Sequence, residues 1–130
     1  MIHPTADASP QAKIGINTSL WHQAQVREGA AIGNNCIIGK NVYIDKNVII
    51  GNYCKIQNNA LLYHGVTLEN GVFIGPQCIL TNDKVPRAVN SKGVLKGDDE
   101  WIEGKILVKT GASLGAGSCI LPGITIGKYA

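Results

Sequence analysis

The chain has 130 residues, 45% of them hydrophobic but only 5% aromatic, and its formal net charge is +3. This length and composition predict one domain with an aliphatic core, and the mild, dispersed charge excludes a basic stripe of the kind that binds nucleic acid. No stretch approaches the roughly 18 consecutive apolar residues of a membrane span, and the amino terminus shows no leader pattern, so we expect a soluble cytoplasmic protein without a membrane partner.

An aliphatic residue or alanine recurs every six residues as far as Leu80. This aliphatic position is occupied by Ile2, Ala8, Ile14, Leu20, Val26, Ile32, Ile38, Ile44, Ile50, Ile56, Leu62, Leu68, Ile74 and Leu80. From Ala8 onward a small or β-branched residue lies two places before each of them, and this small position includes Cys36, Cys54 and Cys78. Because side chains two apart share a strand face, each hexad predicts a short strand with both positions inward. The cysteines are then expected to be small buried hydrophobes.

Turn residues follow each aliphatic position. Glycine often comes first, and the next two positions are rich in Asn, Lys and Gly. Asn and Gly tolerate left-handed backbone, so they are expected to turn the chain between strands. A chain built in this way is a solenoid, whose turns bury their aliphatic residues by stacking on one another.

The repeat breaks after Leu80 and resumes at Val108, Leu114, Ile120 and Ile126. The interval is not a multiple of six, so residues 83 to about 107 are expected to form one inserted loop on the surface. The chain stops inside a hexad at Ala130, without a capping helix. We therefore expect either a shortened sequence or another element that covers this end.

The hexad pattern resembles the hexapeptide-repeat acyltransferases over essentially the whole chain outside the insertion. That resemblance implies an all-β, left-handed parallel β-helix with three hexads in each triangular coil. Residues 1–130 would then form one domain of about six coils.

With three hexads per coil, residues 18 apart stack in columns at the corners of the triangle. One column holds Asn34, Asn52 and Asn70 and is expected to be structural; the others hold His22, Lys40, Asn58 and Pro76, and Glu28, Lys46, His64 and Asn82. His64 lies beneath Asn82, the last regular residue before the insertion. A histidine can accept a proton near neutral pH and a side-chain amide can hold a polar substrate. His64 and Asn82 are therefore the candidate catalytic residues, although either could be an ordinary turn residue.

Within this family, the segments KIQNNALLYHGVTLENGVFIGP and TNDKVPRA resemble N-acetyltransferases of nucleotide-linked 3-amino sugars. The resemblance implies acetyl-CoA as donor, a nucleotide sugar as acceptor, and a homotrimer with its sites between subunits. The candidate substrate-binding residues are Asn58, Asn59, Tyr63 and Arg87, and the candidate coenzyme-binding residues are Gly115, Ala116 and Gly117. Members of that group often carry an acidic or other residue at this position, so His64 departs from the pattern of the group.

The expected reaction is direct acetyl transfer with His64 as general base, because no cysteine has the sequence context of an acyl-enzyme nucleophile. Acetyl transfer to a sugar hydroxyl is an alternative that also uses a histidine base. A non-catalytic scaffold would explain the repeat but would leave the insertion without a purpose. A γ-class carbonic anhydrase would need three histidines placed for zinc, whereas His3, His22 and His64 are widely spaced, and the cysteines lack zinc-ligand spacing; no metal site is predicted.

Overall fold

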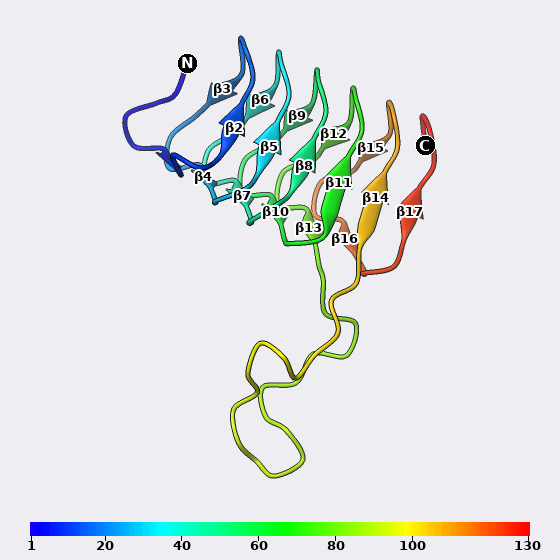
Figure 1. Ribbon diagram of the computed structural model, residues 1–130. Helices are drawn as coiled ribbons and strands as arrows, with labels where there is room; N and C mark the ends of the chain where they lie inside the picture. Colours follow the sequence, from blue (N-terminus) through cyan, green and yellow to red (C-terminus); the bar gives the residue numbers. More distant parts are fainter.

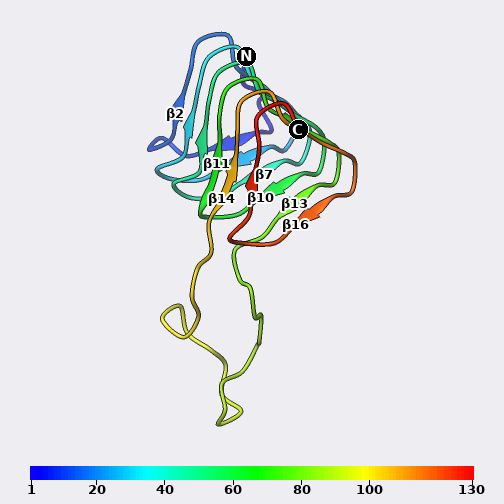
Figure 2. The ribbon, with the colours of Figure 1, turned by 90° about the vertical axis from the view of Figure 1, so that its right-hand side faces the viewer.

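The computed structural model describes residues Met1–Ala130 and consists of short strands, turns and one long loop. The strands are parallel and stack along one axis as a left-handed β-helix (Figure 1). Figure 2 looks approximately along the stack, and successive coils overlap there in a triangular outline. The structure has no helix that could span a bilayer.

Three parallel sheets form the faces of the prism. The first sheet contains β1 (Asp7–Ala8), β4 (Gln25–Val26), β7 (Tyr43–Ile44), β10 (Leu61–Leu62), β13 (Ile79–Leu80) and β16 (Cys119–Ile120). The second sheet contains β2 (Lys13–Ile14), β5 (Ala31–Ile32), β8 (Ile49–Ile50), β11 (Val66–Leu68), β14 (Ile106–Val108) and β17 (Thr125–Ile126). The third sheet contains β3 (Ser19–Leu20), β6 (Ile37–Ile38), β9 (Lys55–Ile56), β12 (Phe73–Ile74) and β15 (Ser113–Leu114).

The register confirms the prediction of three hexads per coil. Ile14 pairs with Ile32, and Ile32 pairs with Ile50, so each strand lies beside the strand 18 residues further along the chain. The expected all-β fold and triangular coil are therefore confirmed, with six strands in the first and second sheets and five in the third.

The core contains the aliphatic and small positions of the hexads. A cluster of 25 buried residues runs along the axis, and Leu62, Ile74 and Leu80 are fully inaccessible to solvent. Burial of such side chains contributes about 1.5–3 kcal/mol each relative to exposure. Cys36, Cys54 and Cys78 are buried and unpaired, as expected for small core residues. The stack of coils thus buries enough apolar surface to drive folding, which a single coil could not do.

Asn and Gly turn the chain as predicted, and glycine has a second role as well. From Asn17 onward the left-handed residue of a turn is its third, for example Asn35, Tyr53 and Gly65 with φ of 58°, 59° and 101°. The glycine that comes first is required for space instead: a Cβ on Gly51 would lie 2.5 Å from Oδ1 of Asn70. That oxygen accepts the N–H of Asn52 at 2.7 Å, so the missing side chain allows one coil to bond to the next.

The insertion leaves the prism after β13 and returns at β14. It projects from one corner as a long excursion (Figures 1 and 2). Val66 of β11 pairs with Ile106, so the second sheet resumes slightly earlier than the predicted end at about residue 107. Both Ile106 and Val108 point inward, and the sequence frame had identified only Val108. The root of the insertion is closed by a bridge between Asp83 and Glu103.

Candidate functional site

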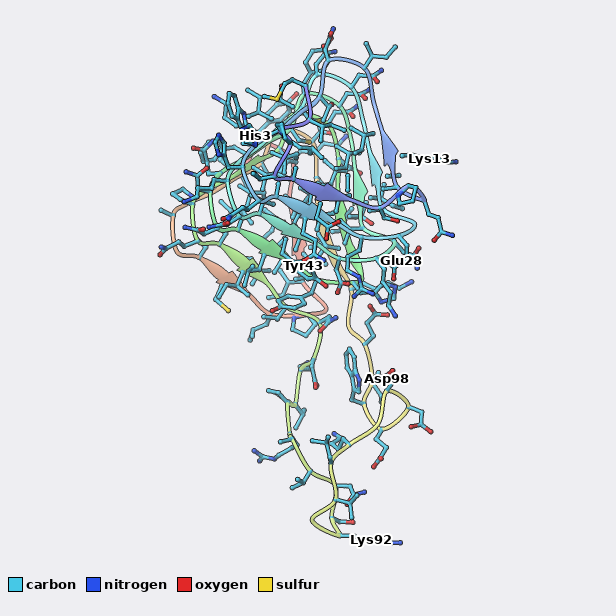
Figure 3. All side chains as sticks on the ribbon, turned by 90° about the vertical axis from the view of Figure 1, so that its left-hand side faces the viewer. His3, Lys13, Glu28, Tyr43, Lys92 and Asp98 are labelled. Carbon is cyan, nitrogen blue, oxygen red and sulfur yellow. The ribbon has the colours of Figure 1, made fainter.

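The insertion leaves from the corner that joins the first sheet to the second, which we call the insertion corner. Its turns comprise residues 27–29, 45–47, 63–65, 81–82 and 121–123. In Figure 3 the labelled Tyr43 and Glu28 lie near the point where the insertion departs, and Asp98 lies on the insertion nearer to the prism than Lys92. This corner therefore combines turn residues of several coils with side chains of the insertion.

The backbone of His64 is fixed from both neighbouring coils. Its N–H donates to Oδ2 of Asp45 at 2.9 Å, and its carbonyl accepts a hydrogen bond from Nδ2 of Asn82 at 3.2 Å. Asn82 in turn accepts the N–H of Gly104 through its own carbonyl at 2.8 Å, which ties the returning end of the insertion to the same place. The structure thus brings His64, Asn82 and the insertion together.

The insertion supplies an acidic partner for the imidazole. Nδ1 of His64 contacts Oε1 of Glu103, and this pair leaves Nε2 without a protein partner. The side chain of His64 is 31% exposed, so the ring is partly accessible to a small molecule. Oε1 of Glu103 is inaccessible to solvent and accepts no hydrogen bond, so the close contact with Nδ1 is its one polar interaction. A carboxylate on one ring nitrogen selects the tautomer that leaves the other nitrogen as a proton acceptor.

Gly65 makes room for this pair. Its φ is 101°, and a Cβ there would lie 2.9 Å from the carbonyl oxygen of Gly104 and 3.1 Å from Oε1 of Glu103. Both the backbone conformation and the close approach of the insertion therefore require glycine. The residue that follows the histidine determines how closely Glu103 can sit.

A second carboxylate anchors the corner from below. Asp45 is 7% exposed, and its Oδ1 accepts the hydroxyl of Tyr43 at 2.9 Å and the N–H of Lys46 at 2.8 Å. Nη1 of Arg27 lies 3.4 Å from the same oxygen. The pKa of Arg27 is raised by its hydrogen bonds to Tyr43 and, to a smaller extent, to Glu28. The pKa of Tyr43 is raised by burial and, to a smaller extent, by its hydrogen bond to Asp45. Both carboxylate oxygens of Asp45 thus accept hydrogen bonds from the corner, since Oδ2 accepts the N–H of His64.

Side chains of the insertion and of the corner enclose a hollow of about 320 Å³, which we call the His64 hollow. Its wall includes Arg27, Asp45, His64, Asn82, Asp98, Trp101 and Glu103. The volume is within the range of small-molecule sites. No group of three or more His, Cys, Asp or Glu side chains is arranged to hold a metal ion.

The other predicted site residues are distributed over three places. Tyr63 precedes His64 at the insertion corner, and its ring contacts Tyr43 edge to face at a centroid distance of 5.8 Å. Arg87 lies on the insertion and lines a separate hollow.

Asn58, Asn59 and residues 115–117 lie at the corner that joins the third sheet to the first, which we call the proline corner (residues 21–23, 39–41, 57–59, 75–77 and 115–117). Oδ1 of Asn58 accepts the N–H of Lys40 at 2.9 Å, and Asn59 has φ of 65°, so both help to form turns. Gly115, Ala116 and Gly117 are exposed, and Gly117 has open space where a Cβ would stand. The structure does not bring these residues next to His64 within one chain.

Sequence reasoning missed Glu103, Asp45 and Trp101. Asp45 could have been found, because it lies 18 residues before Tyr63 and therefore one coil below the His64 turn. Glu103 and Trp101 carried no such signal, since the path of an insertion does not follow from the hexad period.

Comparisons with known proteins agree with the repeat. Residues 11–46 and 47–82 match the family described as bacterial transferase hexapeptide (six repeats), and residues 29–64 match the hexapeptide repeat of succinyl-transferase. No protein of curated function matches the sequence.

Several solved structures have a similar fold. A histidine-to-asparagine mutant of perosamine N-acetyltransferase from Caulobacter crescentus, in complex with CoA and GDP-perosamine, is 21% identical with a TM-score of 0.64, over 98% of this chain and 47% of that chain. The acetyltransferase domain of PglB from Neisseria gonorrhoeae is 22% identical with a TM-score of 0.72, over 96% of this chain and 52% of that chain.

The same PglB domain in complex with acetyl coenzyme A is 21% identical with a TM-score of 0.69, over 95% of this chain and 52% of that chain. This chain therefore spans about half the length of these structures, and the likeness shows a common fold. The two matched segments of the family model cover more than half of the sequence, so the chain belongs to the bacterial transferase hexapeptide family.

Proposed function

We propose that this protein is an acetyl-CoA-dependent N-acetyltransferase that acts on the amino group of a nucleotide-linked amino sugar. The observation that carries the proposal is the His64 hollow, in which Nδ1 of His64 is engaged by Glu103 and Nε2 is free. Similarity in fold to perosamine N-acetyltransferase with CoA and GDP-perosamine supports the choice of donor and acceptor.

His64 is the general base. With the proton on Nδ1 directed at Glu103, the lone pair of Nε2 removes a proton from the amino group of the sugar. Acetyl-CoA supplies the acetyl group as a thioester. The amine nitrogen bonds to the carbonyl carbon, the carbon–sulfur bond breaks, and the proton taken by His64 passes to the departing sulfur. The products are the amide and the free thiol of CoA, while a backbone N–H stabilises the negative charge that develops on the carbonyl oxygen.

Asn82 and Asp98 orient the acceptor. Nδ2 of Asn82 is occupied by the carbonyl of His64, which leaves Oδ1 available to accept a hydrogen bond from the sugar. Asp98 places a carboxylate on the wall of the His64 hollow, which also includes Arg27 and Lys46. A cationic amino group is attracted to this carboxylate, whereas a neutral hydroxyl gains less, so Asp98 favours amine acetylation over the alternative of sugar O-acetylation.

The coenzyme is expected at the proline corner. Residues 115–117 are small and exposed, so a thin pantetheine chain could approach the backbone there. Because this corner and the insertion corner lie apart in one chain, a single site can contain both only if they come from different subunits. This arrangement supports a homotrimer with sites between subunits, in which Asn58 and Asn59 also reach the substrate. The four unpaired cysteines suit a reducing compartment, so a cytoplasmic location is part of the proposal.

The test is acetyl transfer from acetyl-CoA to a panel of UDP-, GDP- and dTDP-linked amino sugars and their hydroxyl analogues. His64→Ala should lower turnover about 100-fold or more, the usual effect of losing a general base. Glu103→Gln should lower kcat while the KM for the acceptor stays near the wild-type value, because Glu103 acts through His64. Near-normal turnover of His64→Ala would remove the base from the mechanism, and absence of acetyl-CoA binding would favour a scaffold.

A further inference from the structure

A second hollow lies on the other side of the returning segment of the insertion. Its volume is about 500 Å³, and we call it the cationic hollow. Lys84, Arg87 and Lys96 line it on the insertion, and Pro122 lines it on the insertion corner. Trp101 lines both this hollow and the His64 hollow, so the two adjoin through one aromatic side chain.

The cations of this hollow have no carboxylate partners. The ion pairs of the chain involve Arg27 and His64, and none involves Lys84, Arg87 or Lys96. The N–H of Lys96 donates to the carbonyl of Ala88 at 2.9 Å, so Lys96 lies across a hairpin from the segment that contains Arg87. Like charges held together without a counter-ion form a ready site for an anion.

The acids of the same wall are already engaged. Oδ1 of Asp83 accepts the N–H of Val85 at 3.2 Å. Glu100 accepts the N–H of Gly97 at 3.0 Å and a hydrogen bond from Nδ2 of Asn90 at 3.1 Å, and these bonds, the backbone one first, lower its pKa, with a smaller contribution from the charge of Lys96. Both carboxylates are therefore bonded to the loop itself, and neither forms an ion pair with a cation of the hollow.

The wall also offers an apolar surface beside the cations. Trp101, Val85, Ile102 and Pro122 contribute to it. An indole ring provides a flat surface on which a nucleobase can stack, worth roughly 1–3 kcal/mol per base. A ligand with both an aromatic ring and a compact negative charge matches this combination.

We propose that the cationic hollow binds the nucleoside diphosphate of the amino-sugar substrate, with the diphosphate on Arg87 and Lys96 and the base against Trp101. This inference rests on the proposed function and extends it. The two hollows differ in the sign of their excess charge: the wall of the His64 hollow has three carboxylates and two basic side chains besides His64, whereas the wall of the cationic hollow has three cations and two carboxylates. A nucleotide-linked amino sugar has a matching distribution of charge, with a cationic amino group at one end and an anionic diphosphate at the other.

The adenosine diphosphate of coenzyme A has the same chemistry, but its connectivity differs. A nucleotide sugar carries the diphosphate directly on the sugar, so its two subsites must be neighbours. In the coenzyme the whole pantetheine arm separates the diphosphate from the thioester. Adjacent hollows that share Trp101 therefore favour the sugar nucleotide.

The test uses the full chain with Trp21→Phe, which leaves Trp101 as the only remaining one of the two tryptophans. UDP, GDP, inorganic pyrophosphate and 3′-phosphoadenosine 5′-diphosphate are titrated by calorimetry and by tryptophan fluorescence at two salt concentrations. UDP or GDP should quench Trp101, and Arg87→Ala and Lys96→Ala should each weaken that binding about tenfold, the effect of losing one charge-assisted contact. Lys92→Ala, at the tip of the insertion, is the matched control and should bind as the wild type does.

The inference would be overturned if UDP and GDP do not bind, or if they bind the Arg87 and Lys96 variants as tightly as the wild type. It would also be overturned if only 3′-phosphoadenosine 5′-diphosphate, the coenzyme nucleotide, binds there. The proposed function fails separately. If nucleotide binding depends on Arg87 while no amino sugar is acetylated, the hollow stands and the reaction is wrong. If acetylation of nucleotide sugars is unaffected by both substitutions, the reaction stands and the hollow is wrong.

Discussion

His64 is defined by its contacts rather than by its position in the repeat. Asp45, one coil below, accepts a hydrogen bond from the N–H of His64, and Asn82, one coil above, donates one to its carbonyl. Glu103 then engages Nδ1 from the insertion. Because backbone and ring are both fixed, Nε2 has one defined direction in which to meet an acceptor. An exposed turn histidine without these partners would sample several rotamers.

Gly65→Ala tests whether the closeness of the insertion matters for catalysis. The substitution introduces a Cβ at φ 101° against Gly104 and Glu103, so it should displace Glu103 and lower kcat about tenfold or more. Gly93→Ala is the matched control, since Gly93 also has positive φ, 74°, but open space around it. Both variants should be destabilised by about 1–3 kcal/mol, the usual cost of such a backbone. Equal kcat values for the two variants would show that the contact is not needed.

Glu69 links neighbouring coils in a pH-dependent way. Its Oε1 accepts the N–H of Thr110 at 2.9 Å and the Thr110 hydroxyl at 3.1 Å, and the backbone bond is the main cause of its lowered pKa. Because the charged form is favoured in the fold, this contribution is complete above the ordinary pKa of 4.5 and is lost as the pH falls through the lowered pKa. Glu69→Gln should therefore reduce the urea midpoint near pH 7 and converge with the wild type in acid. A pH-independent difference, or the same effect from Asp99→Asn on the exposed loop, would contradict this assignment.

At the scale of elements, the asparagine turns connect the coils independently of the active corner. Asn52 accepts the N–H of Asn34 at 2.8 Å and donates its own N–H to Asn70 at 2.7 Å. Asn52→Ala should cost about 1 kcal/mol of unfolding free energy, because the N–H of Asn34 loses its partner. Asn52→Asp retains the acceptor and should recover most of that loss. Acetyl transfer should remain at the wild-type level in both, and a fall like that of His64→Ala would show that the corners are coupled.

The hexads could be predicted because their physical cause is local and periodic. Leu62, Leu68 and Ile74 must all face one axis, and stacking of Asn52 on Asn70 follows once a coil holds 18 residues. The resemblance to a known family supplied the coil size and the handedness, which periodicity does not determine. The structure then showed that glycines such as Gly51 provide space for the next asparagine.

The insertion could be located from the sequence but not traced. Its start after Asn82 followed from the break in the repeat. Glu103 and Trp101 come to the corner through the bridge between Asp83 and Glu103 and the hairpin between Val89 and Leu95, and neither pairing has a periodic signal. Three of the eight residues that line the His64 hollow therefore lie in the part of the chain where no sequence period predicts their position.

At the scale of the whole molecule, the insertion ends in apolar side chains that nothing in the chain covers. Val89, Val94 and Leu95 are 46%, 59% and 76% exposed at its tip. We expect this tip to pack on a neighbouring subunit in the proposed trimer. Analytical ultracentrifugation should give three times the chain mass of 13.8 kDa. Leu95→Lys should shift the protein toward the monomer and lower activity. Ile16→Lys, at an equally exposed residue on another corner, should do neither. A fully active wild-type monomer would rule out sites shared between subunits.

A titration of the histidine ring signals by long-range proton–nitrogen NMR tests directly whether His64 meets the acceptor. The chain has three histidines, and His3 and His22 stack on each other at a centroid distance of 3.6 Å, away from the insertion corner, so they serve as internal controls. Addition of a nucleotide-linked amino sugar should move the Nε2 signal of His64 and leave the other two rings unchanged. A sugar that binds, or is acetylated, while the His64 signals stay in place would show that the chemistry occurs elsewhere.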